Sequence, residues 1–354
     1  MKTKAAVLFE TGKPLRIVEL DMPELQPGQV LVNVAFSGVC RSQLMEMQGK
    51  RGPDKYLPHL LGHEGSGIVL NIGIGITKVK AGDHVVLTWI KGKGQDVCGP
   101  KYRLGKQTIN AGPITTFCTH TIVSENRCVG IPKHIPLDVA ALFGCALPTG
   151  AGIVMNEIKP KPGSSAAVFG VGGVGLSAII ALRSSGCSLI VAVDHDPAKL
   201  NLACVLGATH SINSRETDPI AILSKLTAAN GLDYSVDATG TVRGIETAFS
   251  AVRRGGGLCI FASHPPVADR ILLDPYELIC GKRIQGSWGG ATCPDKDIPN
   301  LLRRCRKQHI HLGSMITHRC RLADVNEALA LLASGTAGRI VLNMLKTHKS
   351  ENPS

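Results

Sequence analysis

The sequence predicts an α/β protein of two domains, a partly open barrel of antiparallel strands and a doubly wound parallel sheet. Residues 1–146 contain short, β-branched apolar runs, separated by Pro-Gly, Ala-Gly-Asp and Gly-x-Gly turns, that do not alternate with helical segments. From residue 147 onward, apolar runs alternate with segments of helical periodicity, which is typical of a parallel sheet with helices on both faces. We therefore expect a β-rich domain at 1–146, completed by 288–354, and a doubly wound domain at 147–287.

Strands dominate the first domain, and strands and helices alternate in the second. The first-domain runs that predict strands are 5–9, 29–35, 67–70, 76–79 and 84–87. In the second domain, strands are predicted at 166–169, 189–193, 210–212, 233–238, 257–263 and 283–287. Helices are predicted near 174–184, 197–206, 219–229, 242–252 and 274–281. The last part of the chain adds an amphipathic helix at 323–333 and a strand at 339–343.

The composition is that of a globular protein with a basic surface. Of its residues, 44% are hydrophobic and 19% are charged. A length of 354 residues is enough for two domains with a sizeable core. The formal net charge is +12, with basic residues concentrated at 91–106 and 303–307. Such a surface attracts nucleic acid, anionic membranes or acidic substrates. Because only 4% of residues are aromatic and no nucleic-acid-binding motif is present, we expect no nucleic-acid partner.

Targeting and membrane signals are weak. The apolar run from Ala5 to Phe9 is too short for the core of a signal peptide, so the expected compartment is the cytoplasm. The twelve cysteines include no C-x-x-C pair, and in a reducing compartment most would be buried apolar residues and a few metal ligands or nucleophiles. The stretch from Gly163 to Leu182 is uncharged and long enough to span a membrane. Its glycines and a turn interrupt it, so we expect no membrane association.

Residues 163–199 carry the pattern of a dinucleotide-binding turn. The strand at 166–169 leads into Gly170-Val171-Gly172-Gly173-Val174-Gly175, a helix follows, and the next strand ends at Asp194. Gly170 permits the sharp turn, Gly172 lets the backbone approach a pyrophosphate, and Gly175 lets the helix pack closely on the sheet. The N-terminus of the helix then offers unpaired N–H groups to the phosphates.

Asp194 indicates which dinucleotide is bound. A carboxylate at the end of the second strand accepts hydrogen bonds from the adenosine ribose hydroxyls and repels a 2′-phosphate, so the sequence favours NAD over NADP. His195 weakens this preference, because a protonated imidazole tolerates a phosphate.

Three further motifs, together with this turn, carry a family resemblance. They are Gly38-Val39-Cys40-Arg41-Ser42, Gly62-His63-Glu64-Gly65-Ser66-Gly67 and Gly144-Cys145-Ala146-Leu147-Pro148-Thr149-Gly150. In this order the four motifs resemble the zinc-dependent alcohol dehydrogenases of the medium-chain dehydrogenase/reductase family, over nearly the whole chain. The resemblance implies a GroES-like first domain and a Rossmann second domain. It also implies hydride transfer between a small-molecule alcohol or carbonyl substrate and NAD.

The resemblance assigns roles to the motif residues. Cys40, His63 and Cys145 match the ligands of a catalytic zinc, and two thiolates with an imidazole suit zinc while leaving a fourth position for substrate. Glu64 matches a carboxylate that supports the ligands or binds the metal transiently, and Ser42 matches the group that takes the hydroxyl proton. The cofactor contacts that the resemblance implies are Thr149 and Val174 at the nicotinamide, Arg41 and Arg339 at the pyrophosphate, and Lys199 near the adenosine ribose.

Three features depart from the family pattern. Many members bind a structural zinc with four closely spaced cysteines, but residues 91–110 contain only Cys98, so we expect one zinc per chain. Gln43 stands where aspartate is often found. Met45 stands where some members carry a relay histidine, so the proton path is followed no further than Ser42.

The sequence leaves other functions open. One is a polyol dehydrogenase of the same family, in which the basic segment 91–106 serves an acidic or phosphorylated substrate. A zinc-free quinone or enoyl reductase would lack the ligand set found here, and a non-catalytic nucleotide-binding protein would not need to keep it. Relatives are dimers or tetramers, so we expect a homodimer or homotetramer.

Overall fold

The computed structural model describes residues 1–345, which form two units. Unit 1 comprises Met1–Cys145 and the chain from Ile316 onward, and unit 2 comprises Ala146–Met315. The chain thus returns to unit 1 at Ile316, later than the residue 288 expected from the sequence.

Hydrogen bonds explain why the chain from 288 to 315 belongs to unit 2. Thr292 Oγ1 donates to the carbonyl of Pro148 (2.9 Å), and Asn156 Nδ2 donates to the carbonyl of Gly290 (3.1 Å). These bonds tie the start of the segment to the first two helical segments of unit 2, at 146–152 and 153–158.

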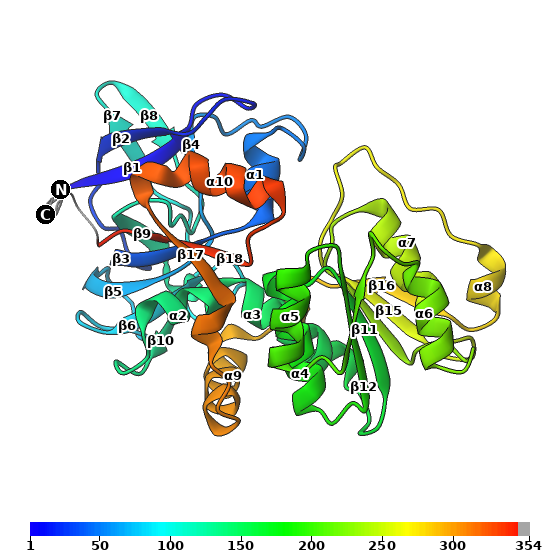
Figure 1. The fold of residues 1–354 in the computed structure, drawn as a ribbon. Coiled ribbons are helices and arrows are strands. Elements are labelled where there is room, and N and C mark those ends of the chain that lie inside the picture. Colours follow the sequence, from blue (N-terminus) through cyan, green and yellow to red (C-terminus); the bar gives the residue numbers. More distant parts are fainter. Residues whose placement is uncertain (346–354) are drawn as a thin grey trace, which may run out of the picture. The chain divides into compact units, whose positions relative to one another are not determined.

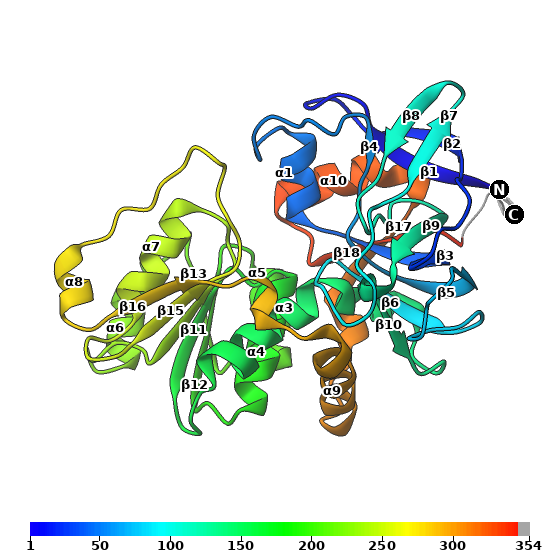
Figure 2. The same ribbon diagram turned by 180° about the vertical axis from the view of Figure 1, so that it is seen from behind.

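Unit 1 is built from two β-sheets. Its strands are β1 (Lys2–Leu8), β2 (Arg16–Asp21), β3 (Gln29–Val39), β4 (His59–Leu60), β5 (Glu64–Ile72), β6 (His84–Thr88), β7 (Lys101–Leu104), β8 (Gln107–Asn110), β9 (His120–Ser124), β10 (Cys128–Ile131), β17 (Ile316–Arg321) and β18 (Arg339–Asn343). One sheet closes into a barrel in the order β1-β2-β7-β8-β4, from which β7 and β8 project as a hairpin (Figures 1 and 2). The other runs β10-β6-β5-β3-β18-β17, with β9 paired to β3. Only β4 with β8 and β17 with β18 pair in parallel among the described strands of this unit.

Short helices connect these strands and cover part of the core. They are α1 (Arg41–Met47), η1 (Glu125–Arg127), α2 (Leu137–Ala141), η2 (Leu142–Gly144), η6 (Leu322–Asp324) and α10 (Val325–Ser334). An apolar cluster joins Val32 of β3, Leu87 of β6 and Phe117 with Leu329 of α10, all of them fully buried. The late helix and strand predicted from the sequence therefore complete the core of the β-rich unit.

The strand expected at 76–79 is not formed. The backbone N–H groups of Thr77 and Lys78 donate to the buried carboxylate of Glu125 (2.7 and 3.0 Å) instead of to a neighbouring strand. The β-branched pattern predicts a strand here, but a side chain far away in the sequence accepts hydrogen bonds from the backbone N–H groups that a strand would use.

Unit 2 is a six-stranded parallel sheet with its helices (Figure 1). Its strands are β11 (Ser165–Phe169), β12 (Leu189–Asp194), β13 (His210–Asn213), β14 (Tyr234–Asp237), β15 (Leu258–Phe261) and β16 (Arg283–Gly286). Its helices are α3 (Ala146–Gly152), η3 (Ile153–Ile158), α4 (Gly173–Ser184), α5 (Pro197–Leu206), α6 (Pro219–Leu226), α7 (Val242–Ala251), α8 (Pro275–Ile279), η4 (Gly289–Ala291), α9 (Pro294–Lys307) and η5 (Leu312–Met315). The strand order β13-β12-β11-β14-β15-β16 is that of a dinucleotide-binding sheet, whose direction of growth reverses between β11 and β14. The doubly wound prediction is confirmed.

Helix α9 was not predicted. Its start and end carry ordinary signals, because acidic Asp295 lies in the first turn and basic Arg304 and Lys307 lie in the last. The buried Ile298, Leu301 and Cys305 recur at helical spacing, but Pro299 lies inside the segment and most of its other residues are polar or charged, so the segment was not recognised as a helix.

The uncharged stretch from Gly163 to Leu182 forms β11, a turn and most of α4, so it is not a single helix. Among residues 1–345, no single helix is long and apolar enough to cross a membrane. One bent pair, Leu137–Gly144 with Ala146–Ile158, passes that test by length and composition only.

Candidate metal and nucleotide sites

Three distant segments of unit 1 bring four potential metal donors together. Cys40 follows β3, His63 and Glu64 lie at the start of β5, and Cys145 follows η2. Their donor atoms, which are two sulfurs, an imidazole nitrogen and a carboxylate oxygen, all lie within 4.8 Å of one another. The structure thus unites the residues that the family resemblance assigned to zinc.

Glycines allow these segments to approach so closely. A Cβ atom on Gly38 would lie 2.5 Å from the carboxyl carbon of Glu64, and one on Gly144 would lie 2.4 Å from the carbonyl oxygen of Leu87. Atoms cannot pack this tightly, so a larger residue at either position would force the strands apart. The glycines that precede Cys40 and Cys145 in the motifs are therefore a packing requirement of the site.

A buried ion pair adjoins the donors. Glu64 is fully buried, and its Oε1 accepts a hydrogen bond from Nη2 of Arg339, which is also buried. Burial raises the pKa of Glu64 above its ordinary value, although Arg339 opposes the rise. Burial lowers the pKa of Arg339, but the carboxylate charge outweighs it, so that pKa lies above its ordinary value.

The second carboxylate oxygen provides a test of whether a cation fits. Glu64 Oε2 is buried and has no hydrogen-bond partner within residues 1–345. A buried acceptor without a donor is costly, and a cation beside it would remove the cost. Two sulfurs and an imidazole are also the ligands that zinc prefers. The donor set therefore fits zinc.

The first cysteine is prepared to be a thiolate. A hydrogen bond from Cys145 holds the pKa of the Cys40 thiol well below its ordinary value, and His63 adds to the effect against the cost of burial. Burial lowers the pKa of His63, but the hydrogen bond and the charge of Cys40 together raise it by more, so the net shift is upward. The same hydrogen bond, together with burial, raises the pKa of the Cys145 thiol, so Cys40 is the first of the two sulfurs to ionise. The thiolate is the form of cysteine that binds metal.

Gln43 connects two of the donors. Its Oε1 accepts a hydrogen bond from the Cys40 backbone N–H (3.0 Å), and its Nε2 contacts Nδ1 of His63. Ser42 Oγ lies 3.5 Å from the same His63 Nδ1. With Nδ1 occupied, Nε2 is the imidazole nitrogen left to bind a metal. Met45, at the relay position, is buried and carries no proton to transfer.

Trp89 touches two of the donors and was missed by the sequence analysis. Its Nε1–H donates to Cys145 Sγ (3.2 Å), and its ring lies edge-on to the His63 ring, with centroids 6.4 Å apart and planes at 77°. The available signal was its position two residues after the strand predicted at 84–87, in a chain with only two tryptophans.

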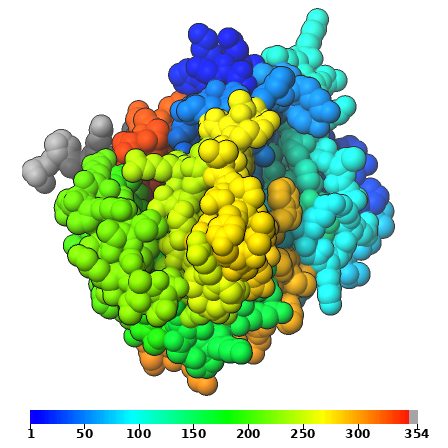
Figure 3. Space-filling view, turned by 90° about the vertical axis from the view of Figure 1, so that its right-hand side faces the viewer, coloured from blue at the N-terminus to red at the C-terminus, as the bar shows by residue number. Residues whose placement is uncertain are grey.

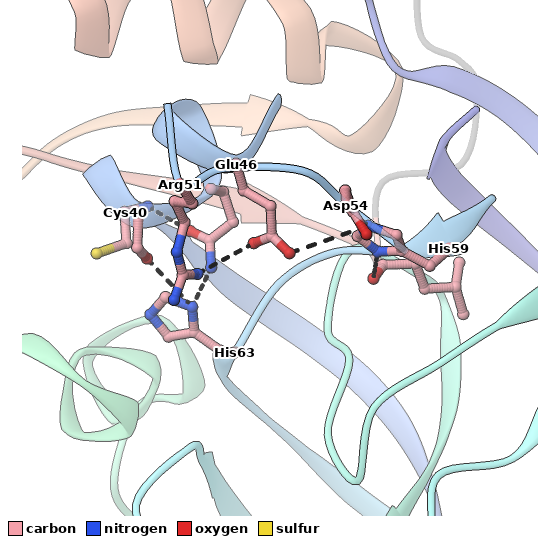
Figure 4. A network of polar contacts seen from close by, with 9 residues as sticks. Cys40, Glu46, Arg51, Asp54, His59 and His63 are labelled. Carbon is pink, nitrogen blue, oxygen red and sulfur yellow. Dashed lines mark hydrogen bonds and ion pairs between the residues drawn. The ribbon is translucent and has the colours of Figure 1, made fainter. Parts of the chain in front are cut away.

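The chain between α1 and β4 is tied down by a polar network (Figure 4). His59 Nε2 lies 2.7 Å from Asp54 Oδ2 and 3.9 Å from Glu46 Oε1, and Glu46 also accepts from Arg51 Nη1 (3.5 Å). Figure 4 shows this network extending away from the cysteine and histidine donors. It fixes the loop that links the first donor segment to the second.

In unit 2, the glycine turn lies at the carboxyl end of β11. Gly170 has a φ of +81°, and a Cβ on Gly175 would lie 2.0 Å from the Gly170 carbonyl oxygen, so the turn itself requires both glycines. By contrast, a Cβ on Gly172 would meet nothing within 4 Å. The backbone is open on this side, at the start of α4, which fits the approach of a pyrophosphate.

Asp194 ends β12 beside this turn. Its Oδ2 accepts from the backbone N–H of Val171 (2.9 Å), and its Oδ1 accepts from the N–H groups of His195 (2.7 Å) and Asp196 (3.1 Å). The carboxylate therefore holds the turn and the start of the next helix together. The His195 side chain is half exposed and lies 3.4 Å from the same carboxylate.

The other expected cofactor contacts are spread over both units. In unit 2, Thr149 lies in α3, Val174 begins the first turn of α4 next to Gly173, and Lys199 lies in α5. Thr149 is 6% exposed, and its Oγ1 has no hydrogen-bond partner in the described part of the chain. In unit 1, Arg41 is exposed at the start of α1, whereas Arg339 is engaged in the buried ion pair.

Comparison with known proteins identifies both units. Residues 26–133 match the alcohol dehydrogenase GroES-like domain, and residues 173–307 match the zinc-binding dehydrogenase domain. The chain is 32% identical over 369 residues to S-(hydroxymethyl)glutathione dehydrogenase from Synechocystis sp., which covers 97% of this chain and 100% of the relative. It is 31% identical over 372 residues to alcohol dehydrogenase 2 from Zea mays, with 97% and 98% covered.

Solved structures of alcohol dehydrogenases have the same fold as this chain. Benzyl alcohol dehydrogenase from Acinetobacter calcoaceticus superposes with a TM-score of 0.88 at 29% identity, covering 97% of this chain and 99% of that one. An alcohol dehydrogenase zinc-binding domain protein from Burkholderia ambifaria superposes with a TM-score of 0.89 at 29% identity, covering 98% and 100%. The GroES-like and Rossmann fold prediction is thus confirmed. The chain belongs to the zinc-dependent alcohol dehydrogenases of the medium-chain dehydrogenase/reductase family, which are oxidoreductases that use zinc and a nicotinamide dinucleotide.

Proposed function

We propose that this chain is an NAD-dependent alcohol dehydrogenase whose single zinc is held by Cys40, His63 and Cys145, with Glu64 as a supporting or transient ligand. The observation that carries the proposal is the convergence of these four donors within 4.8 Å. Three protein ligands leave a fourth position for substrate, which is the pattern of a catalytic zinc. Residues 1–345 bring together two groups of potential donors, and only this one contains cysteine, which supports one zinc per chain.

Residues of the protein would transfer the substrate proton and orient the metal ligands. Zinc, when bound, acts as a Lewis acid that lowers the pKa of an alcohol hydroxyl. Ser42, whose Oγ lies 3.5 Å from His63 Nδ1, would accept the hydroxyl proton while giving its own hydroxyl proton to the cofactor ribose. Gln43 holds the imidazole against the Cys40 backbone, so the ligand orientation does not depend on substrate.

We assign the cofactor as NAD. Support comes from the carboxylate of Asp194, which lies beside the glycine turn and would accept hydrogen bonds from ribose hydroxyls while repelling a 2′-phosphate. The proposed cofactor contacts are Gly170, Gly172, Gly173, Val174, Gly175, Asp194, Lys199 and Thr149 in unit 2, with Arg41 and Arg339 in unit 1. The buried Oγ1 of Thr149, which has no hydrogen-bond partner within residues 1–345, supports its place in this set.

The substrate is a small-molecule alcohol, or the corresponding aldehyde or ketone in the reverse direction. An acidic substrate held by the basic segment 91–106 is the second candidate. Part of that segment is already engaged, because Lys91 pairs with Asp96 (2.6 Å) and Arg103 donates to Thr108 (3.0 Å). This observation favours an uncharged alcohol.

We also propose that the chain forms a homodimer or homotetramer. Strand β16 is the last strand of its sheet and, within residues 1–345, pairs on one side only. Leu272, Ile279 and Trp288 nearby in the sequence are 85%, 80% and 81% exposed. Figure 3 shows the chain around residues 250–280, in yellow, at the surface of unit 2. An unpaired edge with exposed apolar residues is suited to a second copy, and a monomer in light scattering would contradict this.

The cytoplasm is the compartment we propose. All twelve cysteines are free, which supports a reducing environment. We propose no nucleic-acid or membrane partner, and retention on heparin or anionic vesicles at physiological salt would contradict this.

Zinc content tests the site. We expect one zinc per chain in the wild-type protein and NAD reduction with at least one member of a panel of alcohols. Cys40→Ser should lose both, whereas Cys98→Ser, which changes an exposed cysteine outside the donor group, should keep both. A wild-type protein without zinc that still binds NAD would overturn the proposal.

A further inference from the structure

Trp89 contacts the donor group without being one of its ligands. Its Nε1–H donates to Cys145 Sγ (3.2 Å), and its ring edge faces His63. We propose that Trp89 is a positioning residue that orients the Cys145 sulfur as a metal ligand through the indole N–H. This inference rests on the proposed role of Cys145 as a zinc ligand.

The chemistry of the two atoms supports this role. An indole nitrogen is a donor only, so the sulfur must be the acceptor. Hydrogen bonds to an ionised acceptor are roughly twice as strong as those between neutral groups, so the contact gains most when Cys145 is a thiolate.

One side chain constrains two ligands that come from different segments. Cys145 follows η2, whereas His63 precedes β5, and Trp89 reaches both from the end of β6. The ring planes of Trp89 and His63 meet at 77°, which is the edge-to-face arrangement that aromatic rings prefer. The indole therefore couples the position of the sulfur to the orientation of the imidazole.

The backbone is anchored at Trp89 and in the residues that follow it. Arg127, which is 6% exposed, donates from Nη1 to the Trp89 carbonyl. On the following side, the Gly92 N–H donates to the carbonyl of Asn126 (2.8 Å), and the Gln95 N–H donates to Glu125 (2.8 Å). Helix η1 therefore fixes the segment that carries Trp89.

The presence of only two tryptophans gives a clean test. Trp288 belongs to unit 2 and is 81% exposed, so Trp288→Phe leaves Trp89 as the sole tryptophan and serves as the matched control. Competition with a chromophoric chelator would measure the zinc dissociation constant. We expect it to rise by roughly 10–100-fold in Trp89→Phe and to stay unchanged in Trp288→Phe.

A spectroscopic readout separates positioning from general support of the fold. In ¹⁵N-labelled Trp288→Phe protein, the single indole N–H resonance should shift when zinc is added, and it should also shift when Cys145→Ser is introduced. This measurement leaves Trp89 intact, so it decides the question even where Trp89→Phe does not fold.

The outcomes are distinguishable. The role of Trp89 would be overturned if zinc affinity were unchanged in Trp89→Phe. It would also be overturned if the indole resonance shifted neither with zinc nor with Cys145→Ser. Neither result would contradict the zinc site itself. A wild-type chain that binds no zinc would overturn the proposed function, and this inference with it.

Discussion

The two sites of this chain are built in opposite ways. The glycine turn of unit 2 is contiguous, running from β11 through α4 to the end of β12. The donor group of unit 1 is assembled from three segments that meet around the buried Glu64, with glycines at the contact points. In a contiguous site each residue has a local reason, so single substitutions have separable effects. In an assembled site each residue supports the others, so we expect a single substitution to disturb the other residues of the site as well.

The largest effect is expected at the buried ion pair of unit 1. Arg339→Met removes the partner of Glu64 and leaves a buried carboxylate without compensation. Breaking such a pair from one side costs about 3–5 kcal/mol in the free energy of unfolding. Urea denaturation of the wild type and the variant would measure it.

The double variant Glu64→Leu with Arg339→Met is the control for this prediction. Replacing both charges by apolar groups of similar size should recover most of the loss, because no buried charge is left unpaired. If Arg339→Met alone were neutral, the assembled site would not depend on this pair, and the contrast between the two units would fail.

The difference between the sites also explains what could be predicted from the sequence. The strands and helices of the parallel sheet follow from local periodicity, and so do the roles of Gly170 and Gly172 in the turn. The donor set does not follow from spacing, because distance along the chain says nothing about distance across two sheets. Cys40, His63 and Cys145 could be named only through a family resemblance.

Two of the features that were missed share one physical cause. The strand expected at 76–79 is lost to a carboxylate from residue 125, and the contact of Trp89 with Cys145 joins residues from separate segments. Both depend on tertiary packing that no local pattern encodes. The ion pair of Arg339 with Glu64 is a further contact between distant segments, and the expected role of Arg339 at the cofactor remains a prediction.

An intermediate effect is expected in the glycine turn, where two neighbouring substitutions should separate binding from stability. Gly172 has a φ of −74°, and a Cβ there meets nothing within 4 Å, so Gly172→Ala should leave the melting temperature unchanged. It should weaken NAD binding by roughly 10–100-fold, because the methyl group fills the side on which a phosphate would accept backbone hydrogen bonds. Fluorescence titration with NADH would measure the affinity.

Gly175→Ala is the matched variant of the same turn. Its Cβ would lie 2.0 Å from the Gly170 carbonyl oxygen, so it should destabilise the fold by about 1–3 kcal/mol. Equal losses of stability in the two variants would show that the turn is not separable by position.

The smallest effect is expected for a charged group near the surface of unit 2. Glu277 in α8 accepts from Arg254 and from Lys282 Nζ (2.9 Å), and these hydrogen bonds hold the pKa of its carboxyl at about 2, below the ordinary 4.5. Because the pKa of the folded state is the lower one, this group stabilises the fold above pH 4.5 and loses its contribution as the pH falls towards 2. Charges so close to solvent contribute little, so Glu277→Gln should lower the melting temperature by only roughly 2–4 °C at pH 7.

The difference in melting temperature between Glu277→Gln and the wild type should narrow from pH 5 to pH 4. Glu10→Gln, at an exposed position of unit 1, is the control and should show no difference at either pH. A deficit in Glu277→Gln as large as that of Arg339→Met would mean that burial does not separate the two ion pairs, and the contrast would then rest on the donor group alone.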